Sequence, residues 1–151
     1  MTQSKDATPV VWRDEYSIGD TELDGHHKQL IRYIHVLEDP ATRRGDGDFI
    51  AMMVDGLADY AGYHFAAEER RMEASGYPQL EKHRREHADF AKDVAIFRRA
   101  FGEGSPRLEK ALLGYLKDWL LTHILTSDHV MGQWLAEHPV ASEDADRPDR
   151  Q

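Results

Sequence analysis

Four potential metal-ligating side chains flank a single turn near the middle of the chain. His64 and Glu68 precede this turn, His83 and His87 follow it, and the members of each pair are four residues apart. On an α-helix this spacing places two side chains on one face, about one turn apart. Between the pairs lies the Ser-Gly-Tyr-Pro segment 75–78, in which glycine can end a helix and proline can begin one. The pattern predicts an antiparallel helical hairpin.

The positions of these residues about the turn predict that they face one another. Glu68 and His83 are equally far from the bond between residues 75 and 76, and so are His64 and His87. Because each helix rises by about 1.5 Å per residue, the four groups should lie at two adjacent levels between the helices. Imidazoles and a carboxylate gathered in this way can bind a metal ion.

Two further turns extend this symmetry to the rest of the chain. His27 and His64 are equally far from the bond between residues 45 and 46, in a run rich in glycine and aspartate. His87 and His123 are equally far from Ser105, in a segment with two glycines and a proline. Gly and Pro mark these segments as helix boundaries. Three turns therefore predict four antiparallel helices that bring these histidines to a common height.

Apolar residues recur every three or four positions in four segments, and no strand pattern competes with them. We expect helices over about 21–38, from about 48 to the turn at 75–78, over about 78–101, and from about 106 to before 139. Short connections between amphipathic helices predict an all-α, up-down-up-down four-helix bundle.

The two ends of the chain differ from this helical part. Residues 10–18 contain apolar side chains in an irregular pattern and should form an N-terminal arm against the bundle, so the domain is expected to span residues 10–138. Residues 1–9 and 139–151 are polar and nearly devoid of apolar side chains, and we expect them to be disordered.

Composition limits the location and the partners of the protein. A chain of 151 residues suits one domain. It has no cysteine, so any metal must be held by nitrogen and oxygen. A net charge of −9 argues against binding to nucleic acid. No membrane span or secretory leader is visible, and no dedicated interface stripe is present. We therefore expect a cytoplasmic monomer.

Seven candidate ligands remain, which is more than one tetrahedral zinc ion needs. They are His27, His64, Glu68, His83, His87, His123 and Asp128. Seven ligands suit two metal ions, because carboxylates can bridge two cations. If a solvent oxygen also bridges, one ion remains one ligand short of an octahedron, and a small molecule can bind there.

The segments around these residues resemble those of a known family. They are Trp12, Ile18 with Gly19, residues 23–30 (LDGHHKQL), 64–69 (HFAAEE), 77–78 (YP), 83–87 (HRREH), 119–124 (WLLTHI) and Asp128. In these segments the chain resembles the bacterial hemerythrins over roughly residues 11–135, and all seven ligand positions of that family are filled. The resemblance implies reversible dioxygen binding at a non-haem di-iron centre.

The resemblance also implies a role for each residue of the site. Glu68, Asp128 and a solvent-derived oxygen would bridge two iron ions. His83, His87 and His123 would hold the six-coordinate iron, and His27 and His64 the five-coordinate iron to which dioxygen binds. Entering water would displace the dioxygen. The apolar neighbours of the ligands are candidates for the wall that excludes water, namely Phe65, Trp119, Leu120 and Ile124.

Two features depart from the expected pattern. The family usually has glutamine before the first ligand histidine, where this chain has His26, but register and symmetry both favour His27 as the ligand. His123 and Asp128 are five residues apart, which leaves them about 140° apart on a regular α-helix. Because a widened turn would bring them together, we predict an irregularity near residues 123–128.

Several functions are compatible with such a site. A dioxygen-binding protein could serve transport, storage, delivery or sensing, with a separate oxidase or signalling protein as partner. An oxidase, peroxidase or nitric oxide scavenger using the same metals is the alternative. The chain has no Glu-x-x-His pair of the kind that ferritin-type carboxylate oxidases use, and no spare acid or base stands out. We therefore predict no catalytic residue and no enzymatic activity.

Overall fold

The computed structural model of the chain describes residues 10–39, 47–102 and 108–139. The predictions of a disordered N-terminus over residues 1–9, of a disordered tail beyond residue 139, and of a helix start near Pro106 lie outside the described residues.

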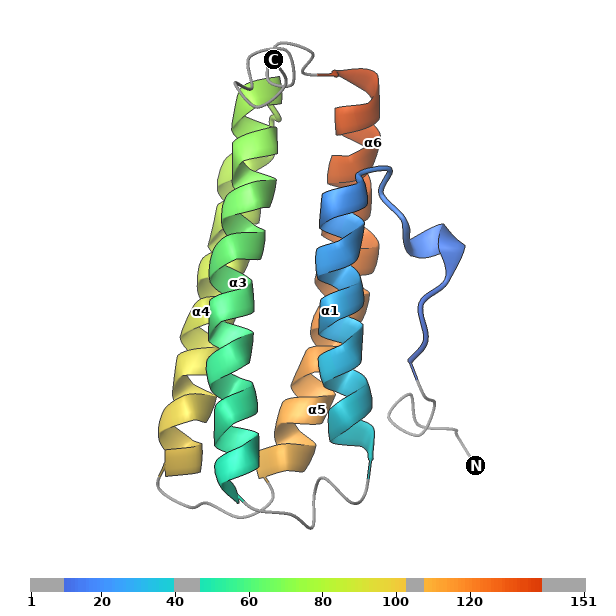
Figure 1. Cartoon of the computed structure of the whole chain (residues 1–151). Coiled ribbons are helices and arrows are strands. Elements are labelled where there is room, and N and C mark those ends of the chain that lie inside the picture. Colours follow the sequence, from blue (N-terminus) through green and yellow to red (C-terminus); the bar gives the residue numbers. More distant parts are fainter. Residues whose placement is uncertain (1–9, 40–46, 103–107, 140–151) are drawn as a thin grey trace, which may run out of the picture.

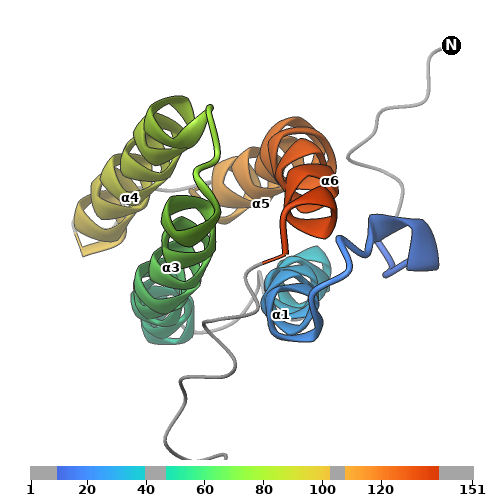
Figure 2. The same cartoon turned by 90° about the horizontal axis from the view of Figure 1, so that it is seen from above.

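Four helical rods lie side by side in an up-and-down arrangement, as Figures 1 and 2 show from the side and from above. The elements are the short 3-10 helix η2 (Asp14–Tyr16), α1 (Thr21–Glu38), α3 (Gly47–Ser75), α4 (Leu80–Gly102), α5 (Leu108–Trp119), the π-helix η3 (Leu120–Asp128) and α6 (His129–Glu137). The last three form one continuous fourth rod (Figure 1). No strand occurs in the described ranges. The prediction of an all-α four-helix bundle is confirmed.

The helix ends follow from local capping. The side chain of Asp20 accepts a hydrogen bond from the Leu23 N–H and caps α1. Gly76 ends α3 with a φ of 71°, and the Tyr77 N–H donates to the Met72 carbonyl at 2.9 Å. This is the bond expected where a left-handed glycine closes a helix. The next helix begins at Leu80 rather than at the predicted Pro78, because residues 77–79 complete the turn.

Two apolar clusters fill the bundle, one on each side of the predicted ligand level. The larger contains Leu30 of α1 and Ile124 of the fourth rod, whereas the smaller contains Leu23 of α1 and Met131 of the fourth rod. His27 lies between Leu23 and Leu30 in sequence. The predicted site therefore interrupts the core partway along the bundle, where apolar side chains on both sides exclude water.

The N-terminal arm packs on the bundle as predicted. Val10, Trp12 and Tyr16 are partly buried against the larger apolar cluster. At the end of the arm, Ile18 lies so close to Gly132 of α6 that a Cβ at residue 132 would be 2.6 Å from the Ile18 Cβ. Glycine thus permits the close approach between arm and helix.

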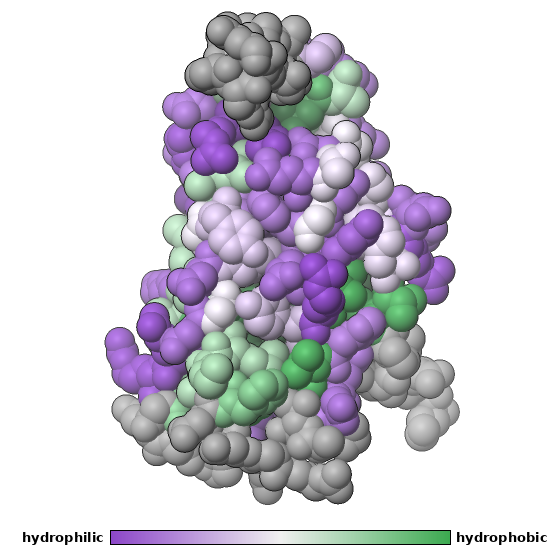
Figure 3. All heavy atoms as spheres, in the orientation of Figure 1, coloured by the Kyte–Doolittle hydropathy of each residue, from purple (hydrophilic) through white to green (hydrophobic). Residues whose placement is uncertain are grey.

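One face of the bundle is mainly polar. Figure 3 shows a largely hydrophilic face, with apolar side chains gathered in its lower part. Among the described residues, no helix is both long enough and apolar enough to cross a membrane.

Candidate metal centre

The structure brings the seven predicted ligands together inside the bundle. None of the seven residues is more than 3% exposed. They come from all four rods: His27 from α1, His64 and Glu68 from α3, His83 and His87 from α4, and His123 and Asp128 from η3. The mirror symmetry about three turns therefore correctly predicted that six of these side chains meet, while Asp128, which has no mirror partner, joins them as the family resemblance implied.

The seven side chains form two groups that share both carboxylates. One contains Glu68, His83, His87, His123 and Asp128, and the other contains His27, His64, Glu68 and Asp128. Within each group, one ligand atom per residue lies within 4.8 Å of all the others. His26 belongs to neither group, although it precedes His27 in sequence.

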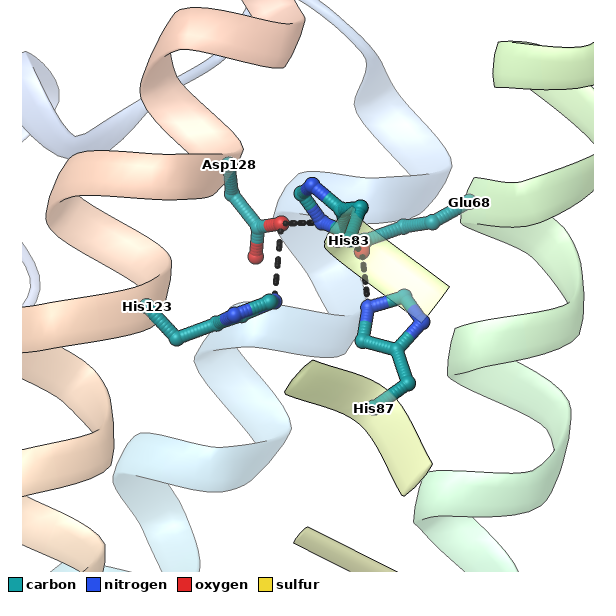
Figure 4. A group of neighbouring side chains, drawn as sticks. All are labelled: Glu68, His83, His87, His123 and Asp128. Carbon is teal, nitrogen blue, oxygen red and sulfur yellow. Dashed lines mark hydrogen bonds and ion pairs between the residues drawn. The ribbon is translucent and has the colours of Figure 1, made fainter. Parts of the chain in front are cut away.

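The three-histidine group is drawn in Figure 4, where His123 and Asp128 point from the fourth rod toward the side chains of α3 and α4. Asp128 Oδ1 lies 2.8 Å from His83 Nε2 and 3.2 Å from His123 Nε2. Glu68 Oε1 lies 3.0 Å from His87 Nε2 and 3.2 Å from His83 Nε2. Three imidazoles thus surround these two oxygens: His83 contacts both, His123 contacts only that of Asp128, and His87 contacts only that of Glu68.

The second oxygens of the same carboxylates face the two-histidine group. Glu68 Oε2 lies 3.0 Å from His64 Nε2 and 3.3 Å from His27 Nε2. Asp128 Oδ2 lies 3.1 Å from His27 Nε2. Each carboxylate therefore stands between the two groups with one oxygen toward each.

The π-helix places Asp128 in this cluster. Its span, Leu120–Asp128, contains both His123 and Asp128. Bonds from residue i to i+5 widen the turn, so residues five apart come to lie about one turn above each other. The hydroxyl of Thr126 donates to the Leu121 carbonyl, five residues earlier, at 3.0 Å. The predicted irregularity is confirmed, and Asp128 is fully buried.

Comparison with known proteins agrees with this architecture. Residues 19–135 match the Hemerythrin HHE cation binding domain. The chain belongs to the hemerythrin family. It is 33% identical over 132 residues to a bacteriohemerythrin from Stenotrophomonas maltophilia, covering 85% of this chain and 83% of the relative. A bacteriohemerythrin from Ralstonia nicotianae is 30% identical over 139 residues, which is 91% of this chain and 98% of the relative.

A solved structure agrees with the fold. A crystal structure of a hemerythrin mutant has a TM-score of 0.75 and 26% sequence identity, and the alignment covers 84% of this chain and 97% of that chain. Hemerythrins are non-haem di-iron proteins that bind oxygen. The protein is accordingly a hemerythrin with a buried cluster able to hold metal.

The donor atoms of this hemerythrin are arranged as metal ligands rather than as hydrogen-bond partners of one another. Among the described residues, His64 Nε2, His123 Nε2 and Asp128 Oδ2 are buried but make no hydrogen bond of acceptable geometry. Buried polar atoms without partners destabilise a fold, and clusters of them are rare. All three atoms belong to the two groups, where bound cations would satisfy them.

In the metal-free protein, hydrogen bonds between protonated histidines and the two carboxylates hold the cluster together. Burial alone would lower the pKa of His27, but hydrogen bonds to Asp128 and Glu68 raise it to about 10. The pKa of His83 rises to about 9 because contacts with the same carboxylates outweigh burial. Burial and the charge of Glu68 act to raise the pKa of Asp128, yet His123 and His27 hold it below its usual range. Metal ions would replace imidazole protons here.

Outer contacts orient three of the imidazole rings through their second nitrogen. The contacts are His87 Nδ1 to Glu69 Oε2 at 2.8 Å, His123 Nδ1 to Glu86 Oε1 at 2.6 Å, and His64 Nδ1 to His26 Nδ1 at 2.9 Å. Such partners fix the ring orientation and tautomer of metal-binding histidines.

Sequence reasoning missed these outer residues. The sequence suggests His26 only as a rival to His27 and predicts that Glu69 is solvated or paired with a basic neighbour. Glu69 does pair with Arg84 at 3.5 Å, but its contact with the His87 ring was not predicted. A usable signal existed, since each of the three outer residues is adjacent in sequence to a candidate ligand and lies about 100° around the same helix. From there its side chain reaches a ring on the neighbouring helix.

Aromatic residues cover two of the imidazoles. The Phe65 ring stacks on His87 with centroids 3.9 Å apart, and the Trp119 ring stacks on His123 with centroids 4.0 Å apart. Leu120 and Ile124 are buried, and all four apolar residues belong to the larger core cluster. Residues of the apolar core therefore lie directly beside the ligand side chains.

Proposed function

We propose that this hemerythrin binds dioxygen reversibly at a di-iron centre, in transport, storage, delivery or sensing. The observation that supports the proposal is the position of Glu68 and Asp128, each with one oxygen toward the three-histidine group and the other toward the two-histidine group. In this proposal both carboxylates would bridge the irons together with a solvent-derived oxygen. His83, His87 and His123 would complete the coordination of one iron, and His27 and His64 would hold the other with a position left for dioxygen.

The protein side chains would make binding reversible by positioning the ligands and excluding water. When bound, two ferrous ions would supply the electrons with which dioxygen is held. Phe65 and Trp119 cover imidazole faces, and Leu120 and Ile124 bring apolar surface beside His123. We assign these four residues to the wall that keeps water from the open position. Carboxylate contacts to Nδ1 of His87 and His123 hold those rings in place.

The test is the visible absorption spectrum of the anaerobically reduced, iron-loaded protein as dioxygen is admitted and then removed. We expect two irons per chain and a charge-transfer band that appears with dioxygen and disappears on its removal. Asp128→Asn keeps the shape of the side chain but removes its charge, so it should lose iron and the band together.

Other outcomes would contradict the proposal in different ways. Fewer than two irons in the unaltered protein would refute the ligand assignment. Immediate, irreversible oxidation with turnover or peroxide release would favour an oxidase, peroxidase or nitric oxide scavenger on the same metals. A cytoplasmic location, a monomeric state and a separate protein partner remain predictions from the sequence.

A further inference from the structure

The Nδ1 atom of one predicted ligand, His64, contacts a histidine, whereas the Nδ1 atoms of His87 and His123 contact carboxylates. Glu69 and Glu86 contact rings of the three-histidine group, whereas His26 contacts His64 of the two-histidine group. His27, the other member of that group, has an Nδ1 with no hydrogen-bond partner among the described residues. The outer contacts of the two groups therefore differ in charge.

His26 is held firmly from outside the cluster. Its ring packs edge-on against Tyr63 and His64, with centroid distances of 5.0 Å to each. Its Nε2 lies 3.9 Å from Glu22 Oε2, and Glu22 is paired with Arg71 at 2.6 Å. These contacts fix the side chain between the surface of the protein and the ligand ring.

The direction of the hydrogen bond follows from the ligand role of His64. If Nε2 of His64 faces a metal, its ring proton must be on Nδ1, which then donates. His26 Nδ1 is therefore the acceptor, and the His26 proton is on Nε2, on the side of Glu22. With Nε2 of His64 on a metal, the two nitrogens 2.9 Å apart require this arrangement of tautomers.

A neutral acceptor has a different effect from an anionic one. A carboxylate that accepts the N–H of a ligand imidazole raises the basicity of that ligand and strengthens its bond to the metal. A neutral imidazole acceptor fixes the orientation of the ligand ring but adds less electron density to that ring. The metal position with fewer histidines thus also has the weaker outer support.

We propose that His26 is a positioning residue that holds His64 toward the metal and leaves the two-histidine position the more weakly bound of the two. This inference rests on the proposed di-iron site. Its consequence is that the iron to which dioxygen binds is also the iron that leaves first.

Iron release to a colorimetric ferrous chelator, followed anaerobically, tests the proposal. The unaltered protein should release its two irons in a fast and a slow phase, one iron each. His26→Leu removes the acceptor and should accelerate the fast phase by about 10- to 100-fold, leaving the slow phase unchanged. His26→Glu supplies a carboxylate and should slow the fast phase, an effect that a loss of stability cannot mimic.

Glu86→Gln is the matched control in the other group. It weakens the support of His123 and should accelerate the slow phase alone. Equal acceleration of both phases by His26→Leu, or a His26→Glu protein indistinguishable from the unaltered one, would overturn the inference. Failure of the unaltered protein to bind two irons would instead refute the proposed function, so the two failures are distinguishable.

Discussion

Single apolar residues beside the ligands contribute to folding and, in the proposed function, to the exclusion of water. Leu120 is buried and follows Trp119, whose ring stacks on His123. Leu37 is equally buried in the same cluster but lies on α1 about three turns from His27. The two leucines therefore separate the effect of packing from the effect on the site.

We predict that Leu120→Ala and Leu37→Ala each lower the free energy of unfolding by about 2–5 kcal/mol, because each leaves a cavity. Only Leu120→Ala should also accelerate oxidation of the dioxygen-bound protein, since its cavity opens beside the ligands. Urea denaturation measures the first effect and decay of the charge-transfer band the second. Equal acceleration by Leu37→Ala would mean that water enters because the whole fold is destabilised, and not because a cavity opens beside the ligands.

Individual residues were predictable from sequence where their position is set by helical geometry. His64 and Glu68 share a face because they are four apart, and mirror positions about a turn determine which residues on the next helix they meet. Glu69 and His26 were not assigned, because their partners depend on side-chain reach between helices. That reach varies with the rotamer and with helix rotation, which spacing along one helix does not determine.

At the scale of elements, the turn between α3 and α4 determines the register of the ligand pairs. Gly76 has a φ of 71° there, and no atom lies within 4 Å of the position that a Cβ would occupy. Gly62, in the middle of α3, has equally open space but no positive φ. Any difference between alanine substitutions at the two positions therefore reports backbone conformation alone.

Gly76→Ala should lower the free energy of unfolding by about 1–2 kcal/mol, because an L-residue is strained in the left-handed conformation. Gly62→Ala should raise it by about 0.5–1 kcal/mol, because alanine favours the helix. Thermal and urea unfolding of the metal-free proteins provide the measurement. The same sign for both variants would show that the turn does not require its left-handed residue.

The fourth rod shows how far element boundaries can be predicted. The spacing of His123 and Asp128 predicted an irregularity over residues 123–128, but the π-helix begins earlier, at Leu120. The requirement that Asp128 face the site specifies that a turn must widen. It does not specify how many neighbouring residues share the i to i+5 bonds, because that depends on packing along the whole rod.

A buried ion pair joins α1 and α5. Lys117 Nζ lies 2.9 Å from Glu38 Oε2, and the Lys117 side chain is buried. Glu38→Gln leaves the buried cation without this anionic partner and should lower the free energy of unfolding by about 1–3 kcal/mol. Lys117→Met removes the cation itself and should cost less. Urea denaturation compares the two, and a larger loss for Lys117→Met would show that the ammonium group stabilises the fold.

At the scale of the whole molecule, the cluster connects all four rods. His27, Glu68, His83 and Asp128 come from α1, α3, α4 and η3, so whatever occupies the cluster links the entire bundle. In the metal-free protein these links are imidazolium–carboxylate pairs. In the loaded protein they would be metal–ligand bonds, so metal binding and folding stability are coupled.

This coupling predicts opposite responses to alkaline pH. His27 and His83 have pKa values of about 10 and about 9 in the folded metal-free chain, above the ordinary 6.5. A raised pKa stabilises the fold fully below pH 6.5, and that stabilisation is lost progressively as pH rises from 6.5 to the folded values of about 9 and about 10. The metal-free protein should therefore lose about 2–5 kcal/mol between pH 7 and pH 9, at about 1.4 kcal/mol per proton and pH unit.

In the iron-loaded protein the ligand nitrogens of these histidines would bind metal in place of the imidazolium proton, so the same change of pH should leave its stability nearly unchanged. Urea denaturation of both forms at pH 7 and pH 9 measures the difference, and titration of surface groups cancels because it is common to both. Equal losses in the two forms would mean that protons do not substitute for the metal. A loss confined to the metal-free form would show that the buried charges keep the bundle folded until iron arrives.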